Sequence, residues 1–121
     1  MQISNPTAKL GEEIAVTYLI KKGYKIIERN FRKGYGEIDI VSVQKNILVF
    51  VEVKTRTTIL HGGAIEAISS QKIKKLVRTV QFYKFINPKL PDALRIDAIL
   101  IDLNSNKEIV NLKHIENISG F

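Results

Sequence analysis

Two short stretches of the chain, GEIDIV and FVEVKTR, hold carboxylates and a lysine among apolar residues typical of β-strands. Side chains alternate along a strand, so Glu52 and Lys54 share one face of the second stretch. For the same reason, Glu37 and Asp39 share one face of the first. Carboxylates held close together repel unless a cation joins them, and Mg²⁺ takes oxygen ligands. These residue types therefore suggest metal-assisted hydrolysis of a phosphate ester, in which a lysine orients or deprotonates water or stabilises charge on the phosphate.

Whether the carboxylates meet depends on the turn between the two strands. A two-residue hairpin turn at Lys45-Asn46 places Asp39 opposite Glu52, with Cβ atoms about 5 Å apart. The same register places Glu37 opposite Lys54. A three-residue loop would put the two carboxylates on opposite faces of the sheet. The alternative to a metal site is a pair of structural salt bridges, and spacing alone leaves both readings open.

The remaining elements must position these strands. We predict, in order, a helix over 5–23, strands over 24–30, 36–43 and 46–56, a helix from 69 or 70 to about 87, and strands over 94–103 and 108–115. Asn5 or Thr7 can cap the first helix, and Ser69 or Ser70 the second. The predicted fold class is α/β, a mixed sheet flanked by helices in the order α-β-β-β-α-β-β.

Two further acidic residues, Glu12 and Asp97, are predicted to face inward. Glu12 lies on the shoulder of the first helix's buried stripe, about 60° from Ala15, and can reach inward. Its alternative role is an interaction with the helix dipole. Asp97 is an inward-facing strand acid that we expect to pair with Arg95 or a helix lysine, with a supporting role at the site as an alternative.

The composition narrows the class of protein. The chain has 121 residues, which predicts a single domain over 1–121. Its formal net charge of +7 favours a polyanionic partner, although a basic protein without such a partner is the alternative. The absence of cysteine excludes disulfides, thiol nucleophiles and cysteine-ligated metal sites. There is no apolar run of membrane-spanning length and no signal-peptide pattern, so we expect no membrane association and a cytoplasmic location.

Several motifs together resemble one known family. The chain contains, in order, GEEIAVTYLIKKGYKIIERNFR, GEIDIV, VFVEVKTR, GGAIEAISSQKIKKL and RIDAILI. In this order and at natural spacing they resemble the YraN-like family of small uncharacterised bacterial proteins. That family is similar to archaeal Holliday-junction resolvases and to the restriction-endonuclease-like superfamily, PD-(D/E)xK. The resemblance covers nearly the whole chain and implies an α-β-β-β-α-β core with nuclease activity.

The resemblance also implies roles for particular residues. Asp39 and Glu52 correspond to metal ligands, and Lys54 corresponds to the catalytic lysine. The backbone carbonyl of Val53 corresponds to a further ligand, and Glu12 to an acidic residue that many members carry on the first helix. The implied cofactor is Mg²⁺ or Mn²⁺.

The chain departs from the family pattern next to the aspartate. Ile38 stands where a proline usually precedes it. The literal proline–aspartate pair, Pro91-Asp92, comes after the E-x-K motif, and we expect it to be part of a loop.

Basic residues near the predicted site are candidate contacts to nucleic acid: Arg32, Arg56, Lys72 and Lys75. Arg56 follows Lys54 on the same face and can bind a phosphate through two hydrogen bonds; an exposed charge at a strand end is the alternative. The helix lysines either follow a DNA backbone or form a solvated face. We expect Glu37 and Gln71 to support the site, and His61 to be a surface residue rather than a base.

Three functions are compatible with these features. The first is a Mg²⁺-dependent DNA endonuclease, with branched or structured DNA as one candidate substrate and a homodimer as a candidate assembly. The second is an inactive nucleic-acid-binding module of the same fold. The third is an adaptor whose basic face binds an acidic protein. The complete set of Asp39, Glu52 and Lys54 favours the first, because an inactive descendant would be free to lose one of them.

Overall fold

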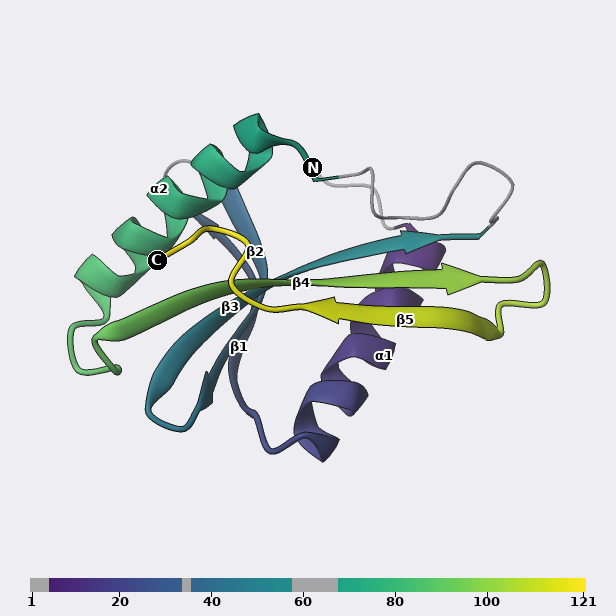
Figure 1. Ribbon diagram of the computed structural model, residues 1–121, viewed down its shortest axis with the longest axis horizontal. Helices are drawn as coiled ribbons and strands as arrows, with labels where there is room; N and C mark the ends of the chain where they lie inside the picture. The colour runs from purple at the N-terminus through teal and green to yellow at the C-terminus, as the bar shows by residue number, and fades with distance from the viewer. Residues whose placement is uncertain (1–4, 34–35, 58–67) are drawn as a thin grey trace.

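Two helices cover opposite faces of a five-stranded sheet (Figure 1). The computed structural model describes residues 5–33, 36–57 and 68–121, so His61 lies outside the described residues. The described elements are α1 (Pro6–Lys21), β1 (Lys25–Lys33), β2 (Gly36–Gln44), β3 (Ile47–Arg56), α2 (Ser70–Ile86), β4 (Ala93–Leu103) and β5 (Ile109–Ile115). This confirms the predicted α/β class and element order, including the α-β-β-β-α-β core.

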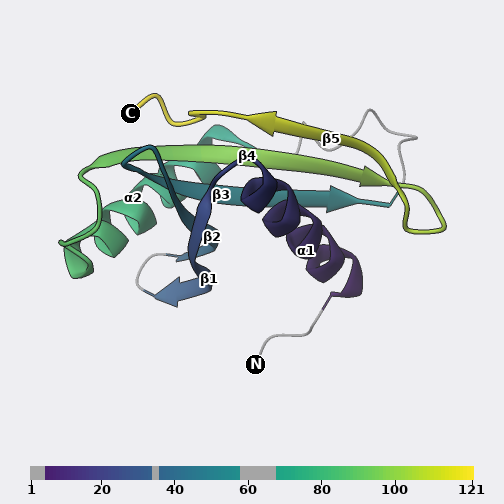
Figure 2. The same cartoon turned by 90° about the horizontal axis from the view of Figure 1, so that it is seen from below.

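Neighbouring strands in the sheet follow the order of the chain, β1-β2-β3-β4-β5. All neighbours are antiparallel except β3 and β4, which are parallel and are connected through α2. Parallel neighbours need such a crossover connection. Seen from below, α1 lies in front of the sheet and α2 behind it (Figure 2). Among the described helices, none is long and apolar enough to cross a membrane.

Local sequence sets the start of both helices. Asn5 caps α1, because its side-chain oxygen accepts a hydrogen bond from the backbone N–H of Thr7 at 3.0 Å. Pro6 suits the first helical position, where no N–H partner is needed. Ser69 caps α2 by accepting a hydrogen bond from the backbone N–H of Lys72 at 3.1 Å. Asn5 and Ser69 are therefore the residues that serve as caps, out of the two predicted for each helix.

Apolar side chains of β3 divide between two core layers. Val49 and Val51 pack in the layer under α1, whereas Leu48 and Phe50 pack in the layer under α2. All four side chains are buried. Continuing the same alternation directs Glu52 to the α2 side of the sheet.

The hairpin between β2 and β3 has the predicted turn. Lys45 and Asn46 have φ angles of 50° and 62°. Two left-handed residues are what a two-residue hairpin turn of matching twist requires. The strands pair in the predicted register from this turn to Ile40 and Val51.

β1 differs from its prediction at its end. The strand continues past Asn30 to Lys33, with Asn30 at a φ of 56° inside it. Asparagine tolerates this left-handed conformation better than most residues. As a result, Glu28 and Phe31 both reach the α2 side, where each contacts Tyr83. The prediction that β1 ends at Asn30 is wrong because a left-handed residue leaves no mark in the hydrophobic pattern.

Candidate active site

The recorded pairing of β2 with β3 stops at Ile40 and Val51, just before the predicted carboxylates. There the side chain of Asp39 replaces the backbone ladder, because Oδ2 accepts a hydrogen bond from the backbone N–H of Val53 at 2.8 Å. This bond ties a carboxylate of β2 to β3 beside Glu52. The structure therefore brings the two predicted carboxylates to one place, the end of the hairpin ladder.

Two lysines approach Glu52 from different elements. Lys72 of α2 places Nζ 2.8 Å from Glu52 Oε2, and Lys54 of β3 places Nζ 3.9 Å from the same oxygen. The side chain of Glu52 is 5% exposed, against 38% for Lys72 and 31% for Lys54. Lys72 thus makes a short, charge-assisted bond, while Lys54 lies at the outer limit of an ion pair. Sequence spacing predicts Lys54 at this position, whereas it predicts Lys72 only as a contact to nucleic acid.

The environment of Asp39 changes its protonation. Burial raises the pKa of Asp39, the charge of Glu52 raises it further, and the pKa reaches about 8 even though the Val53 N–H lowers it. Burial lowers the pKa of Lys72, but the hydrogen bond to Glu52 and the charges of Glu52 and Asp39 together outweigh burial, so the pKa is raised. At neutral pH the carboxyl group of Asp39, with this pKa, is largely protonated in the metal-free chain, and a cation bound beside it would favour the ionised form.

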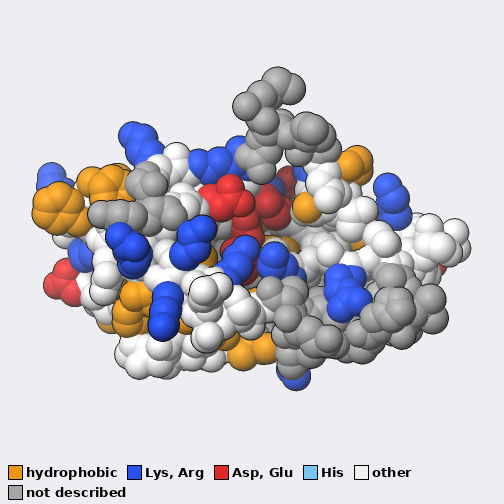
Figure 3. All heavy atoms as spheres, turned by 90° about the horizontal axis from the view of Figure 1, so that it is seen from above, with side chains coloured by type: hydrophobic (Ala, Val, Ile, Leu, Met, Phe, Trp, Pro, Cys, Tyr) orange, Lys and Arg blue, Asp and Glu red, His pale blue; other side chains and the backbone are white. Residues whose placement is uncertain are grey.

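The carboxylates open into a pocket of about 450 Å³ formed by α1, β1, β2 and β3. The charged residues lining it are Lys9, Glu12, Arg29, Arg32, Glu37, Asp39, Glu52 and Lys54. Figure 3 shows acidic side chains gathered in a hollow with Lys and Arg side chains around it. The pocket therefore has an acidic interior with a basic rim.

Glu12 supplies a third carboxylate on the α1 wall of the pocket. Burial raises the pKa of Glu12, against the opposing charge of Arg29, whose Nη2 lies 3.9 Å from Glu12 Oε1. Glu13 is exposed and accepts a hydrogen bond from Arg29 at 2.7 Å. The inward position predicted for Glu12 is therefore observed, while its catalytic role stays a prediction.

The recorded pairing of β2 with β3 ends before Glu37, so the position of Glu37 opposite Lys54 stays a prediction. Glu37 lies opposite Arg32 of β1 and forms a salt bridge with it at 3.2 Å. At this point β2 is still paired with β1, whereas its ladder with β3 has ended. Lys54 approaches Glu52 and lines the first pocket, as Glu37 also does.

A second pocket of about 370 Å³ adjoins the first, since Arg32 and Glu37 line both. The described residues that line it are Arg32, Gly36, Glu37, Lys72, Lys75, Leu76 and Thr79. We call this second pocket the basic groove. It gathers three of the four predicted nucleic-acid contacts, whereas Arg56 and Gln71 are not among the described residues that line either pocket.

Sequence reasoning missed the residues that shape the first pocket. Arg29 and Asn30 of β1 line it, and neither is predicted from the sequence to lie near the site. Gly11 lets α1 approach β3, since a Cβ at this position would lie 1.8 Å from Oγ1 of Thr55. A glycine next to Glu12 within a helical pattern is the one signal that could have indicated this close approach.

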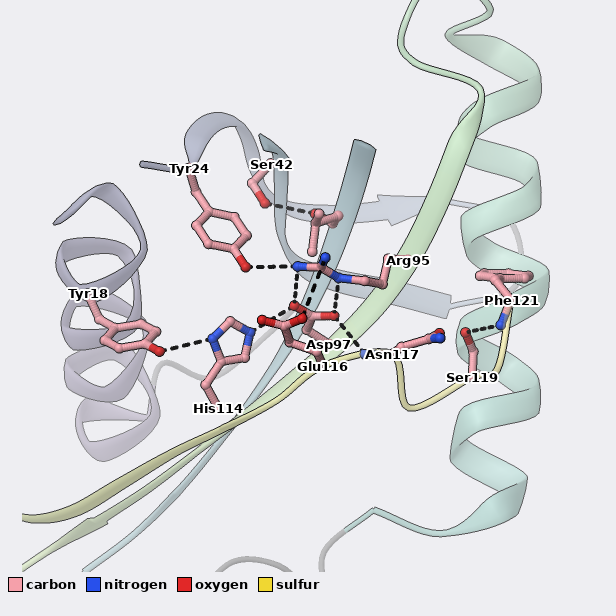
Figure 4. A network of polar contacts seen from close by, with 11 residues as sticks. Tyr18, Tyr24, Ser42, Arg95, Asp97, His114, Glu116, Asn117, Ser119 and Phe121 are labelled. Atoms are coloured by element: carbon pink, nitrogen blue, oxygen red, sulfur yellow. Dashed lines mark hydrogen bonds and ion pairs between the residues drawn. The ribbon is translucent and has the colours of Figure 1, made fainter. Parts of the chain in front are cut away.

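Asp97 lies in a separate buried network (Figure 4). Arg95 donates to both carboxylate oxygens of Asp97 at 2.9 and 3.0 Å, and His114 Nε2 lies 2.8 Å away. The hydroxyl of Tyr18 lies 3.0 Å from His114 Nδ1. Burial opposes the charge on Asp97, but the bonds from His114 and Arg95 hold its pKa below the usual value. The predicted pairing with Arg95 is confirmed.

Comparison with known proteins assigns the chain to a family. The model of the "Uncharacterised protein family UPF0102" matches residues 11–101. The chain belongs to the UPF0102 family. This confirms the resemblance to YraN-like proteins.

Relatives of this UPF0102 chain match it over most of their length. It is 38% identical over 114 residues to a UPF0102 protein of Clostridium novyi, covering 94% of this chain and 95% of the relative. It is 43% identical over 109 residues to one from Caldanaerobacter subterraneus, covering 89% of each. A solved chain from "Structure of EndoMS-dsDNA2 complex" aligns with a TM-score of 0.48 and 14% identity, over 79% of this chain and 36% of that chain. A structural likeness at that level does not extend to function.

The donor set of this UPF0102 chain fits a hard divalent ion at Asp39 and Glu52. The residues that the structure describes include no group of three or more His, Cys, Asp or Glu placed to hold a metal ion. Mg²⁺ does not need such a cage, because it commonly binds through one or two carboxylates plus water and phosphate oxygens. The raised pKa of Asp39 shows that its ionised form lacks a compensating charge beside Glu52, and a cation of this kind would supply it. Use of the Val53 carbonyl as a ligand stays a prediction.

Proposed function

We propose that this chain is an endonuclease that uses Mg²⁺ or Mn²⁺ to hydrolyse phosphodiester bonds in DNA. The observation that carries the proposal is the convergence of Asp39, Glu52 and Lys54 on one pocket with a basic rim. A structural salt bridge would lower the pKa of Asp39, whereas burial beside Glu52 raises it to about 8. An arrangement that is unfavourable for the stability of the folded chain supports a role of these residues in a reaction over a role as structural salt bridges.

Asp39 and Glu52 are the side chains that would hold the ion. When bound, the ion supplies Lewis-acid polarisation of the phosphate and lowers the pKa of a bound water. The hydrogen bond from Val53 to Asp39 fixes one carboxylate relative to β3, so the spacing of the pair does not depend on loop motion. Such preorganisation reduces the cost of assembling the site.

Lys54 is the residue that would act on the reacting groups. Its ammonium lies beside Glu52 and lines the pocket, where it can orient the attacking water and stabilise negative charge on the phosphate. Glu12, on the opposite wall, can accept a hydrogen bond from the same water. The basic groove lies beside this centre, and its Arg32, Lys72 and Lys75 can bind the flanking backbone phosphates.

The proposal is tested by a cleavage screen. We expect labelled duplex, flap or four-way DNA to be cut in Mg²⁺ or Mn²⁺ and to stay intact in EDTA. Lys54→Ala should keep the fold by circular dichroism while the cleavage rate falls about 10²–10³-fold. A preference for four-way DNA over duplex would assign branched DNA as the substrate. Undiminished cleavage by Lys54→Ala would contradict the mechanism.

A matched control is available at the literal proline–aspartate pair. Asp92 is 98% exposed and forms a salt bridge with Lys84 at 3.0 Å, on a loop outside the described lining of either pocket. Asp92→Asn should therefore cleave like the wild type, whereas Asp39→Asn should be inactive. Equal activity of the two variants would show that the carboxylate of Asp39 is not required.

A second candidate is a nucleic-acid-binding module without activity. The observation that favours it is the bond between Lys72 and Glu52, because it balances one of the two acids without a metal ion. DNA binding that weakens with salt, without cleavage in any metal or on any substrate in the screen, would support this candidate over the endonuclease.

A further inference from the structure

Lys72 connects the acidic centre with the basic groove. It lines the groove together with Arg32 and Lys75. Its ammonium, however, donates to Glu52 at 2.8 Å, and Glu52 lines the neighbouring pocket. One side chain therefore belongs to both sites, and in the structure its charge is directed to the acid.

In this position Lys72 competes with any cation for Glu52. Its Nζ contacts Oε2 directly, whereas Nζ of Lys54 lies 3.9 Å from that oxygen. A divalent ion binding to Glu52 repels the ammonium and weakens its bond, because like charges at short range in a buried site interact strongly. The side chain of Lys72 is 38% exposed and unbranched, so it has room and freedom to leave.

The groove offers a new partner for the displaced ammonium. Arg32 already has Glu37 as a salt-bridge partner at 3.2 Å, so part of its charge is offset. Lys75 contributes a second exposed ammonium. A backbone phosphate that enters the groove between them would attract the charge of Lys72 as well.

We propose that Lys72 is a positioning residue with two states: it holds Glu52 in the metal-free protein and binds a backbone phosphate of nucleic acid once a divalent ion has displaced it. This inference rests on the proposed metal and DNA binding, and it adds a mode of regulation. Metal and nucleic acid bind cooperatively, because each removes Lys72 from a state that opposes the other. Linkage requires the same coupling factor in both directions.

The test compares Lys72→Met with Lys75→Met. Methionine keeps an unbranched apolar stem of four heavy atoms, as in lysine, without the ammonium group. Mn²⁺ affinity is measured by calorimetry, and duplex DNA affinity by fluorescence anisotropy in EDTA and in Ca²⁺. We expect Lys72→Met to bind Mn²⁺ about fivefold or more tightly than the wild type, because the competing ammonium is gone. Lys75→Met should bind Mn²⁺ like the wild type, since Lys75 lines only the groove.

DNA binding separates the two variants further. Both should lose affinity in Ca²⁺, with the salt dependence reduced by about one phosphate contact each. Ca²⁺ should strengthen DNA binding of the wild type and of Lys75→Met, but much less that of Lys72→Met. Lys72→Arg, which restores the charge, should recover the coupling at least in part. Circular dichroism confirms that each variant is folded.

Several results would overturn the inference. These are Mn²⁺ affinity in Lys72→Met equal to or below that of the wild type, metal–DNA coupling unchanged in that variant, or no Mn²⁺ binding by the wild type. The failure of hydrolysis is a separate result: coupling through Lys72 without cleavage would reject the endonuclease and keep the inference. Cleavage without coupling between metal and DNA binding would support the endonuclease and reject the role of Lys72.

Discussion

Asp39 is a residue whose position is explained by chemistry better than by stability. Its carboxylate is half-buried beside Glu52, and its pKa rises from 3.8 to about 8 because of this burial and the charge of Glu52. Folding at pH 7 must therefore either protonate Asp39 or bury its charge next to another acid. Both options cost free energy, and a residue kept at such a cost is a candidate for direct participation in a reaction.

Asp39→Asn tests this cost at the residue level. In EDTA at pH 7 we expect the free energy of unfolding to rise by about 1–3 kcal/mol, because an amide avoids both options and can still accept the Val53 N–H. The folded-state pKa is raised, so Asp39 lowers wild-type stability progressively as the pH rises from about 4 to about 8. The advantage of the variant should therefore shrink towards pH 4. Urea unfolding across this range measures it, and a variant less stable than the wild type at pH 7 would contradict the argument.

At the scale of the elements, the sequence predicts those features that depend on interactions between residues close together in the chain. The turn at Lys45-Asn46, the caps Asn5 and Ser69, and the faces of β3 follow from rules that span a few residues. The same rules predict that Asp39 lies near Glu52 without reference to any tertiary contact.

Features that depend on how elements dock were not predictable in the same way. The ladder between β2 and β3 ends early, and Glu37 turns to Arg32 because β1 continues past Asn30. The bond from Lys72 to Glu52 requires the placement of α2 against β3. Periodicity gives the face on which a residue lies, but not the neighbour that another element brings to it.

Gly11 determines how closely α1 approaches the sheet. A Cβ there would lie 1.8 Å from Oγ1 and 2.8 Å from Cβ of Thr55, so neither a small shift nor a new rotamer relieves the overlap. We expect Gly11→Ala to lower the free energy of unfolding by about 1–3 kcal/mol, despite the better helix propensity of alanine. The shifted helix should also move Glu12 and reduce cleavage.

Thermal and urea unfolding measure the stability loss in Gly11→Ala. Thr55→Ala provides the matched control, since it removes Oγ1, the closest overlapping atom. The double variant should recover part of the stability lost in Gly11→Ala. Additive losses in the double variant would show that the close approach of α1 to Thr55 is not the cause.

At the scale of the whole molecule, one buried network joins segments that are far apart in the chain. Asp97 of β4 accepts hydrogen bonds from Arg95, from His114 of β5 and from the backbone N–H of Asn117. Nδ1 of His114 in turn lies within hydrogen-bond distance of the Tyr18 hydroxyl of α1. Protonation of His114 on Nε2 lets it donate to Asp97 while Nδ1 accepts from the tyrosine hydroxyl. Through these hydrogen bonds, the network connects β5 and the residues that follow it to α1 and β4. Its residues are not among the described residues that line the acidic pocket.

Asp97→Asn should show how much of the molecule depends on this network. The variant leaves Arg95 with only Glu116 as an acidic partner among the ion pairs of the described chain, so we expect a loss of about 3 kcal/mol in the free energy of unfolding at pH 7. The folded-state pKa of Asp97 is depressed, so its contribution is present above its unfolded pKa and is lost as the pH falls through the folded value. The difference in free energy of unfolding between wild type and variant, measured by urea unfolding, should therefore narrow below about pH 4.

Glu116→Gln is the control. Glu116 is 61% exposed and lies 3.7 Å from Arg95, so this variant should lose less than about 1 kcal/mol in the free energy of unfolding. A loss in Asp97→Asn no larger than in this control would mean that packing, not the charge of Asp97, holds β5 in place.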